Sequence, residues 1–144
     1  MSDAHAPSPG LAPADVVRAW LDAVNAGEIE AALALTTSDV AIVGPRGTGR
    51  GHAVLRAWLR HAGATFATRA VYARGDAVVV AQHGVWRDLA TGVVVGEADV
   101  ATRFVVRRAR VAELERYPDL DAALRATALG EADALPQPEE DPLG

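Results

Sequence analysis

The sequence predicts an α+β fold in which helices cover one face of a curved antiparallel sheet. Residues 77–87, 93–106 and 109–117 are rich in β-branched and aromatic side chains and are separated by turn residues or charges, as consecutive strands are. Alternate positions along these runs divide into an apolar face and a charged face. The N-terminal third instead carries apolar residues at helical spacing. Segregated helices and strands of this kind are typical of an α+β domain.

The alternation indicates which face of the sheet the helices cover. Even-numbered positions from Val78 to Leu114 are mostly apolar or small, whereas odd-numbered positions carry most of the charges, such as Asp99 and Arg103. Burying one unpaired charge costs several kcal/mol, while burying one Val or Leu side chain gains roughly 1.5–3 kcal/mol. We therefore expect the even-numbered side chains to face the helices and the odd-numbered ones to face outward.

The remaining elements follow from periodicity and from helix start and stop signals. Pro13 is suited to the first turn of a helix, and Gly27 and Gly63 are suited to helix ends. The expected elements are, in order, a disordered lead-in over 1–12, helices over 13–25 and 28–36, a strand over 40–43, a Gly/Pro loop over 44–51, a helix over 52–62, a strand over 65–74, the three long strands, and a helix from 118 to about 130. The acidic, Pro-rich residues 130–144 are expected to be disordered, which leaves one domain over 13–129.

Composition and charge exclude several classes of protein. The chain has 144 residues, a net charge of −5, no cysteine and no lysine, so it lacks the basic surface of a general nucleic-acid binder and cannot form thiolate sites. No apolar run is long enough for a membrane span, and the first residues do not resemble a secretory signal, so a cytoplasmic location is expected. His52 and His61 lack acids at ligand spacing, and we predict neither a metal nor a cofactor.

Several patches of the sequence together resemble the nuclear-transport-factor-2-like superfamily, also called SnoaL-like. The matching stretches are 17–28, 37–45, 50–55, 103–106 and 110–119, and the likeness covers residues 13 to 128. The resemblance implies a cone-shaped, curved antiparallel sheet with three N-terminal helices on its concave face and a short C-terminal helix. The superfamily includes ketosteroid isomerases, limonene-epoxide-hydrolase-like enzymes, polyketide cyclases and many binders without catalytic activity, so the fold alone does not decide the function.

The catalytic residues of these enzymes do not carry over to this chain. By the resemblance, the isomerase tyrosine falls on Trp20, its base on Gly44 and its second acid near Thr102. The epoxide-hydrolase positions fall on Gln82, Gly84 and Arg116, with their helper residues at Ile42 and Gly44. Because a glycine cannot move a proton and no carboxylate remains at these positions, the catalytic residues are unknown and the question of enzymatic activity stays open.

The inward face still offers the parts of a ligand pocket. The predicted pocket residues are Trp20, Ile42, Trp58, Gln82, Trp86, Val100, Thr102 and Arg116. The tryptophans either pack in the core or form the walls of the pocket. Arg116 either reaches solvent at the strand end, or pairs with Asp119 or Asp121, or binds the carboxylate or another anion of a ligand.

The outward face carries a second group of polar residues, which we interpret as a dimer face. They are His83, Asp99, Arg103, Glu113 and Glu115. A histidine beside a carboxylate is also the usual general-base arrangement, but cross-strand ion pairs on an outer surface are the more common reading. A one-residue bulge, for which Gly84 and Gly96 are candidate positions, would turn part of a strand over and reverse this interpretation.

The leading hypothesis is a homodimeric binding domain for a small hydrophobic molecule, with an acidic molecule as one option. The alternative is a cofactor-independent enzyme, such as an isomerase, polyketide cyclase or epoxide hydrolase, with a non-standard active site. A third hypothesis is a dimeric protein-interaction module with a collapsed cavity. Nucleic acids and membranes are not expected partners.

Overall fold

The computed structural model describes residues 12–44, 47–62 and 64–136, without the side chains of residues 61 and 62. The expected lead-in and most of the expected tail lie outside these residues. The elements are, in order, α1 (Pro13–Asn25), α2 (Ile29–Ala34), β1 (Thr36–Gly44), β2 (Gly47–Arg50), α3 (His52–Ala62), β3 (Ala64–Arg74), β4 (Ala77–Arg87), β5 (Val94–Arg107), β6 (Arg110–Tyr117), α4 (Leu120–Thr127) and the short 3₁₀ helix η1 (Glu131–Asp133). None of the helices in the described residues is long and apolar enough to cross a membrane.

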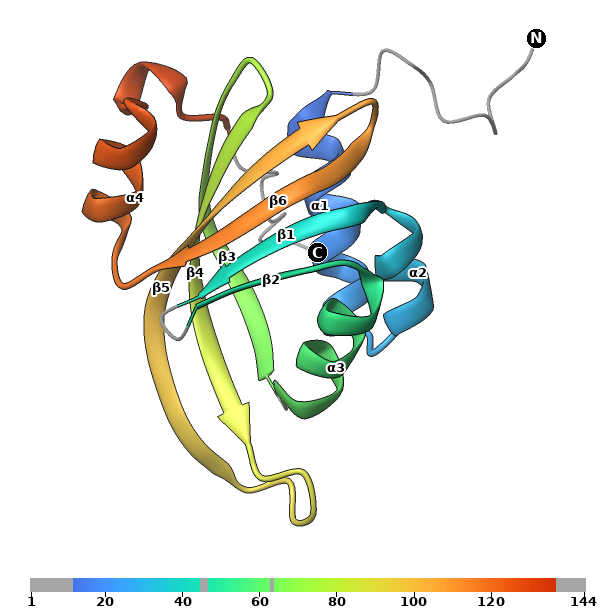
Figure 1. Ribbon diagram of the computed structural model, residues 1–144. Coiled ribbons are helices and arrows are strands. Elements are labelled where there is room, and N and C mark those ends of the chain that lie inside the picture. The colour runs from blue at the N-terminus through green and yellow to red at the C-terminus, as the bar shows by residue number, and fades with distance from the viewer. Residues whose placement is uncertain (1–11, 45–46, 63, 137–144) are drawn as a thin grey trace, which may run out of the picture.

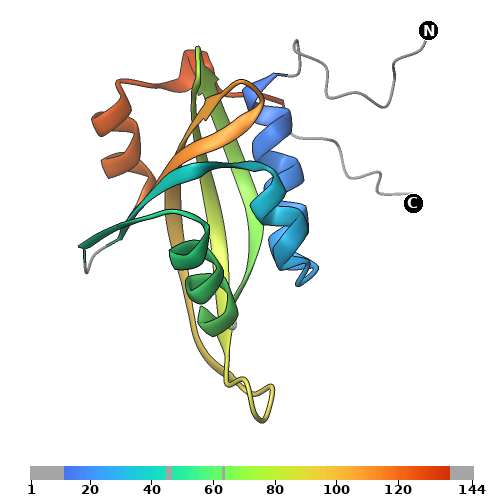
Figure 2. The same cartoon turned by 45° about the vertical axis from the view of Figure 1, so that its right-hand side comes forward.

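The strands form one curved six-stranded sheet in the order β2-β1-β6-β5-β4-β3 (Figure 1). Helices α1, α2 and α3 lie on one side of this sheet and α4 lies on the other (Figures 1 and 2). The α+β class and the three N-terminal helices are thus as predicted. The sheet is antiparallel except at one place, where β1 pairs with β6 in parallel. The chain reaches this parallel position through β2, α3 and the long strands that separate the two in sequence.

The inward face of the long strands forms the main core, as the alternation predicts. Val78, Val80, Phe104 and Leu114 are buried with residues of α1 such as Val17 in one apolar cluster. Odd-numbered Val79 and Ala101 instead pack with Ala123 of α4 and Leu129 in a second, smaller cluster. The C-terminal helix therefore covers part of the face that the sequence assigns to charged residues.

A bulge in β6 changes the alternation at the start of that strand. Val105 pairs with Glu113, but the next pair is Val106 with Val111, which leaves Ala112 without a partner in β5. Val111 is completely buried in the main core, so Val111 and not Ala112 faces the helices, contrary to the predicted alternation. The bulge follows a two-residue hairpin turn in which Arg108 (φ 52°) and Ala109 (φ 64°) both adopt the left-handed conformation that such turns require.

The elements differ from the predicted ones mainly in three respects. Helix α2 ends at Ala34 and β1 already begins at Thr36, four residues before the expected strand. The Gly-rich stretch expected as a loop contains strand β2, because its backbone pairs with that of β1 from Ala41 to Gly44. The chain also stays ordered beyond the expected domain end at 129, since the Leu135 N–H donates to the Val71 carbonyl at 2.8 Å.

The hairpin of β4 and β5 extends beyond the helices, and one of its edges is free (Figure 1). The pairing of β5 with β6 covers β5 residues 101–107. On the edge that faces away from β4, β5 residues 94–100 therefore have no neighbouring strand among the described residues. Val95 has no partner in β4, because Trp86 pairs with Gly96 and Arg87 pairs with Val94. Both Val93 and Val95 are largely exposed, at 61% and 67%.

The bulge predicts unequal costs for two valine substitutions. Val111→Ala removes two buried methyl groups, and we expect it to lower the free energy of unfolding by about 1–3 kcal/mol. Val95→Ala is the control, since Val95 is 67% exposed and its loss is expected to cost under about 0.5 kcal/mol. Urea unfolding of both variants measures the difference. Equal losses would show that Val111 does not face the core.

Candidate functional site

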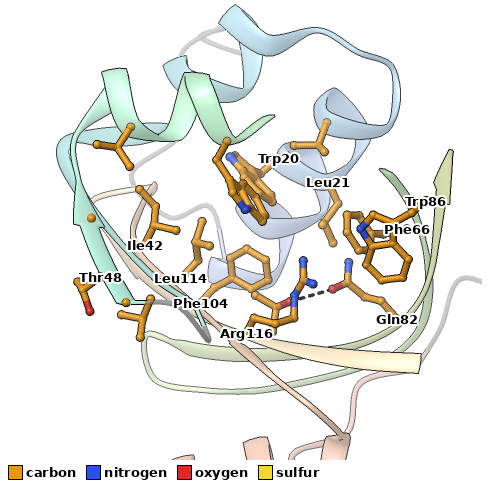
Figure 3. A pocket seen from close by; sticks show the side chains of 18 residues that line it. Trp20, Leu21, Ile42, Thr48, Phe66, Gln82, Trp86, Phe104, Leu114 and Arg116 are labelled. Atoms are coloured by element: carbon orange, nitrogen blue, oxygen red, sulfur yellow. Dashed lines mark hydrogen bonds between the residues drawn. The ribbon is translucent and has the colours of Figure 1, made fainter. Parts of the chain in front are cut away.

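A cavity of about 680 Å³ lies between the inward face of the sheet and the helices. Figure 3 shows the side chains that line it. The helices contribute Trp20, Leu21, Val24, Val54 and Trp58; β1 and β2 contribute Ile42, Val43, Gly44, Gly47, Thr48 and Gly49; and β3 to β6 contribute Phe66, Gln82, Trp86, Thr102, Phe104, Leu114 and Arg116. Most of these side chains are apolar, and the polar ones come mainly from the long strands.

Trp20 and Phe104 join the helical side of the cavity to the sheet. Their rings meet edge to face, with centroids 5.5 Å apart and an interplanar angle of 67°. Both residues are buried, and in the described part of the chain the indole Nε1 of Trp20 has no hydrogen-bond partner. Trp20 stands where the resemblance places the isomerase tyrosine, so this position supplies an indole N–H in place of a hydroxyl group.

A second aromatic pair forms one end of the cavity, and its packing depends on a glycine. The rings of Phe66 and Trp86 are nearly perpendicular, with centroids 5.9 Å apart. A Cβ atom added at Gly84 would lie 2.8 Å from Cη2 of Trp86 and 3.0 Å from Cε1 of Phe66. Such contacts are closer than carbon atoms tolerate. Gly84 therefore leaves the space that the two rings fill, and no bulge occurs there.

Asn25 fixes the backbone of Phe66 at the end of α1. Its side-chain nitrogen donates to the Phe66 carbonyl at 2.8 Å, and its side-chain oxygen accepts from the Phe66 N–H at 2.9 Å. The amide group thus pairs with β3 as a neighbouring strand would. This contact connects α1 to β3 and holds the Phe66 ring at the cavity wall.

Arg116 reaches the cavity without an acidic partner among the described residues. Its guanidinium carbon lies 5.1 Å from the centre of the Phe66 ring and 5.8 Å from that of Trp58, within the range of cation–π attraction. Its Nε is buried and makes no hydrogen bond. Burial lowers the pKa of Arg116 from its ordinary value, although an arginine stays protonated at neutral pH. Asp119 does not pair with Arg116: its carboxylate caps α4 by accepting from the Ala122 N–H at 2.8 Å.

Gln82 and Thr102 form a buried hydrogen bond on neighbouring strands. The Thr102 hydroxyl donates to Oε1 of Gln82 at 3.0 Å, and the two residues are only 5% and 3% exposed. Arg116 is the residue paired with Thr102 on the next strand, so the three polar side chains come from adjacent strands. In Figure 3 the Gln82 amide lies beside the Arg116 guanidinium.

The described lining residues provide no group for proton transfer near neutral pH. Arg116 is the one ionisable side chain among them, and none is Asp, Glu or His. The described residues also contain no group of three histidine or acidic side chains arranged to hold a metal ion. Among these residues the cavity therefore supplies hydrogen-bond donors and apolar surface, but no general base.

Seven of the eight predicted pocket residues line the cavity. Val100 does not join them; it borders a separate hollow with Ala81, His83 and Asp99. Phe66 is not among the predicted pocket residues, because the sequence indicates a strand over 65–74 but not which of its residues face the helices. Thr48 was not predicted either, because β2 was expected to be a loop. The pairing partners of these two strands would have identified both residues.

The predicted outer-face residues lie in two ion-paired groups. His83 contacts Asp99 through Nδ1 at 2.8 Å and Glu97 through Nε2 at 2.9 Å, and Arg103 bridges Glu113 and Glu115. Its hydrogen bonds to Asp99 and then to Glu97, whose carboxylates accept, raise the pKa of His83 above its ordinary value. None of the predicted outer-face residues lines the main cavity. Asp99 is exposed and the other four are partly buried, so the group is a mutually paired, partly covered charged surface.

The His83 contacts predict a pH-dependent contribution to stability. Because the folded pKa is raised, this contribution is fully present below the unfolded value of about 6.5 and is lost as the pH rises through the folded value. We expect His83→Gln to lower the melting temperature at about pH 5.5 and to have little effect at about pH 9. Circular dichroism melts at both pH values measure this. A loss of equal size at both would show that the protonated histidine is not the stabilising species.

Solved structures with the same fold include proteins of several names. A nuclear-transport-factor-2-like protein of unknown function from Cytophaga hutchinsonii is 14% identical, with a TM-score of 0.66 over 79% of this chain and 96% of its own. TerC, co-crystallized with polyporic acid, is 23% identical, with a TM-score of 0.66; the match covers 83% of this chain and 97% of TerC. A nuclear-transport-factor-2-like protein from Burkholderia xenovorans is 27% identical, with a TM-score of 0.61; the match covers 80% of this chain and 95% of that protein.

The comparison with curated proteins gives no significant match. A protein family, in contrast, matches most of the chain. The SnoaL-like domain matches residues 17–114, from within α1 to the middle of β6. The helices, the curved sheet and this match agree, and the chain belongs to the family of SnoaL-like domains.

Proposed function

We propose that this SnoaL-like domain binds a small hydrophobic molecule in the cavity between the sheet and the helices. The observation that carries the proposal is a cavity of about 680 Å³ in which Arg116 is the one ionisable group among the described lining residues. Pockets for small molecules in proteins usually measure about 300–1,000 Å³ and combine apolar walls with a few fixed polar groups. The walls of this cavity and its Gln82–Thr102 pair fit that description.

The same lining supports binding over the two alternative functions. An isomerase, cyclase or epoxide hydrolase of this fold would need a group that moves a proton, and the described lining offers none near neutral pH. A module with a collapsed cavity would need the tryptophans to fill the space. Instead, Trp20, Trp58 and Trp86 all lie around open volume, and Trp58 is 37% exposed.

Ligand binding predicts that a larger side chain at the cavity wall weakens the uptake of an apolar probe. Val54 lines the cavity from α3 and is 43% exposed, so Val54→Trp can occupy cavity space without disturbing the core. We expect the variant to bind the neutral dye N-phenyl-1-naphthylamine at least about tenfold more weakly than the wild type does, measured by the fluorescence of the dye.

Ala53→Trp is the matched control, because Ala53 is exposed on the same helix and does not line the cavity. Its affinity for the dye is expected to stay within about twofold of the wild-type value. Equal affinity in all three proteins would place the dye elsewhere, and absence of binding in all three would contradict the proposed function.

We also propose that the domain forms a homodimer through the part of the outward face of β4, β5 and β6 that α4 leaves uncovered. This face carries the paired charges of His83 and Arg103, and the largely exposed Val93 and Val95 lie at the nearby end of the β4–β5 hairpin. In a two-fold dimer the same surface meets its own copy, so a reversed charge acts on both subunits at once.

A charge reversal on the outward face is therefore expected to weaken the dimer. Light scattering after size exclusion should give twice the chain mass of 15.0 kDa for the wild type and a larger monomer fraction for Asp99→Arg. Asp22→Arg, on the exposed side of α1, is the control and should remain dimeric. A wild-type monomer, or an equal effect of both substitutions, would exclude this interface.

A further inference from the structure

We propose that the ligand is a flat apolar carboxylate with a single negative charge, held end-on by Arg116. This inference rests on the proposed function and specifies the class of molecule that the cavity takes. It depends on three features of the site: the aromatic surroundings of the guanidinium, the edge of the guanidinium that stays accessible, and the donors beside it.

The aromatic surroundings take the place of a counter-ion. Phe66 and Trp58 lie 5.1 Å and 5.8 Å from the guanidinium carbon, and no carboxylate of the described residues pairs with it. Aromatic rings attract the cation without using its N–H groups, because the attraction comes from the ring faces. The hydrogen-bonding capacity of Arg116 is therefore left for a molecule that enters the cavity.

The buried edge of Arg116 determines how an anion can approach. Nε is enclosed by the protein and has no partner, so a carboxylate cannot take the side-on position that uses Nε and one Nη. In Figure 3 the tip of the guanidinium, with its two Nη atoms, points toward the cavity below Trp20. A planar carboxylate can accept two parallel hydrogen bonds from this tip, which is the bidentate geometry that arginine favours.

Gln82 adds a further donor to the same place. The Thr102 hydroxyl occupies Oε1 of Gln82, which leaves the Nε2 hydrogens of the amide free for a ligand. Gln82 is only 3% exposed, and it is bonded to Thr102, the residue that pairs with Arg116 on the next strand. The accessible groups at this end of the cavity thus donate hydrogen bonds, which suits the acceptor-only oxygens of a carboxylate.

The number of charges selects among anions. One guanidinium neutralises one negative charge, and the described lining supplies no second cation. A phosphate monoester carries close to two negative charges at neutral pH, so the excess charge would stay unpaired among apolar side chains, which is unfavourable. The perpendicular rings of Phe66 and Trp86 at the same end favour a flat apolar body next to the carboxylate.

The inference is tested with three molecules that share one ring system. We expect 2-naphthoate to bind at least about tenfold more tightly than 2-naphthamide and 2-naphthyl phosphate in calorimetry at neutral pH. In the Arg116→Met variant, the affinity for 2-naphthoate should fall to that for 2-naphthamide, and the affinity for 2-naphthamide should stay within about threefold of its wild-type value.

Arg116→Lys should bind 2-naphthoate with an affinity between those of Arg116→Met and the wild type, because an ammonium group carries the charge but lacks the planar fork. Arg125→Met, which removes an exposed arginine of α4, is the control and should change nothing.

A spectroscopic measurement on the wild type keeps the test decisive even if an Arg116 variant does not fold. In ¹⁵N spectra of the arginine side chains, 2-naphthoate should shift the Nη signals of Arg116 more than its Nε signal, and 2-naphthamide should shift neither. A dominant Nε shift would overturn the end-on geometry.

The possible failures are distinguishable. Equal affinities for acid and amide, or tighter binding of the phosphate, would overturn the inference while leaving a binding cavity. Uptake of N-phenyl-1-naphthylamine without uptake of any of the three compounds would do the same. If neither the dye nor the three compounds bind, both the inference and the proposed function are wrong.

Discussion

The separation of charge from apolar surface across β4 and β5 is the constraint on which the rest of the structure depends. Adjacent residues of a strand point to opposite faces, so Gln82 and His83 cannot both face the helices. On the outward face, His83 contacts the carboxylates of Asp99 and Glu97 at 2.8 Å and 2.9 Å. On the inward face, Gln82 accepts a hydrogen bond from the Thr102 hydroxyl. A slip of one residue would bury the charges and expose Val78 and Val80. The register of the sheet therefore fixes the contents of the cavity.

Arg116 is the exception to this separation, and its surroundings explain how it is tolerated. Arg116 is partly buried, and a charge withdrawn from water normally requires an acidic partner, because its desolvation is costly. Here desolvation by burial lowers the pKa of Arg116, and two aromatic rings supply part of the compensation. The buried, unpartnered Nε remains an uncompensated loss of roughly 1–3 kcal/mol. Such a loss is easier to understand in a binding site than in a structural core.

Local patterns in the sequence predict most of the fold and most of the cavity. The long strands show their faces directly, so Gln82, Trp86, Thr102 and Arg116 could be assigned to the interior from alternation alone. The features that were missed depend on pairing between distant segments. The parallel contact of β1 with β6, the pairing of β2 with β1 and the register shift at Ala112 leave no local pattern. Phe66 could not be assigned for the same reason, because Asn25 and Gly84 position it from elsewhere in the chain.

The unpaired edge of β5 has a consequence for behaviour at high concentration. Its backbone N–H and C=O groups over residues 94–100 could template the addition of strands from other molecules, and the valines at its beginning are exposed. Glu97 and Asp99 project from this segment and are 56% and 84% accessible, so each incoming copy would bring like charges together. The acids that pair with His83 thereby also act as gatekeepers against open-ended aggregation.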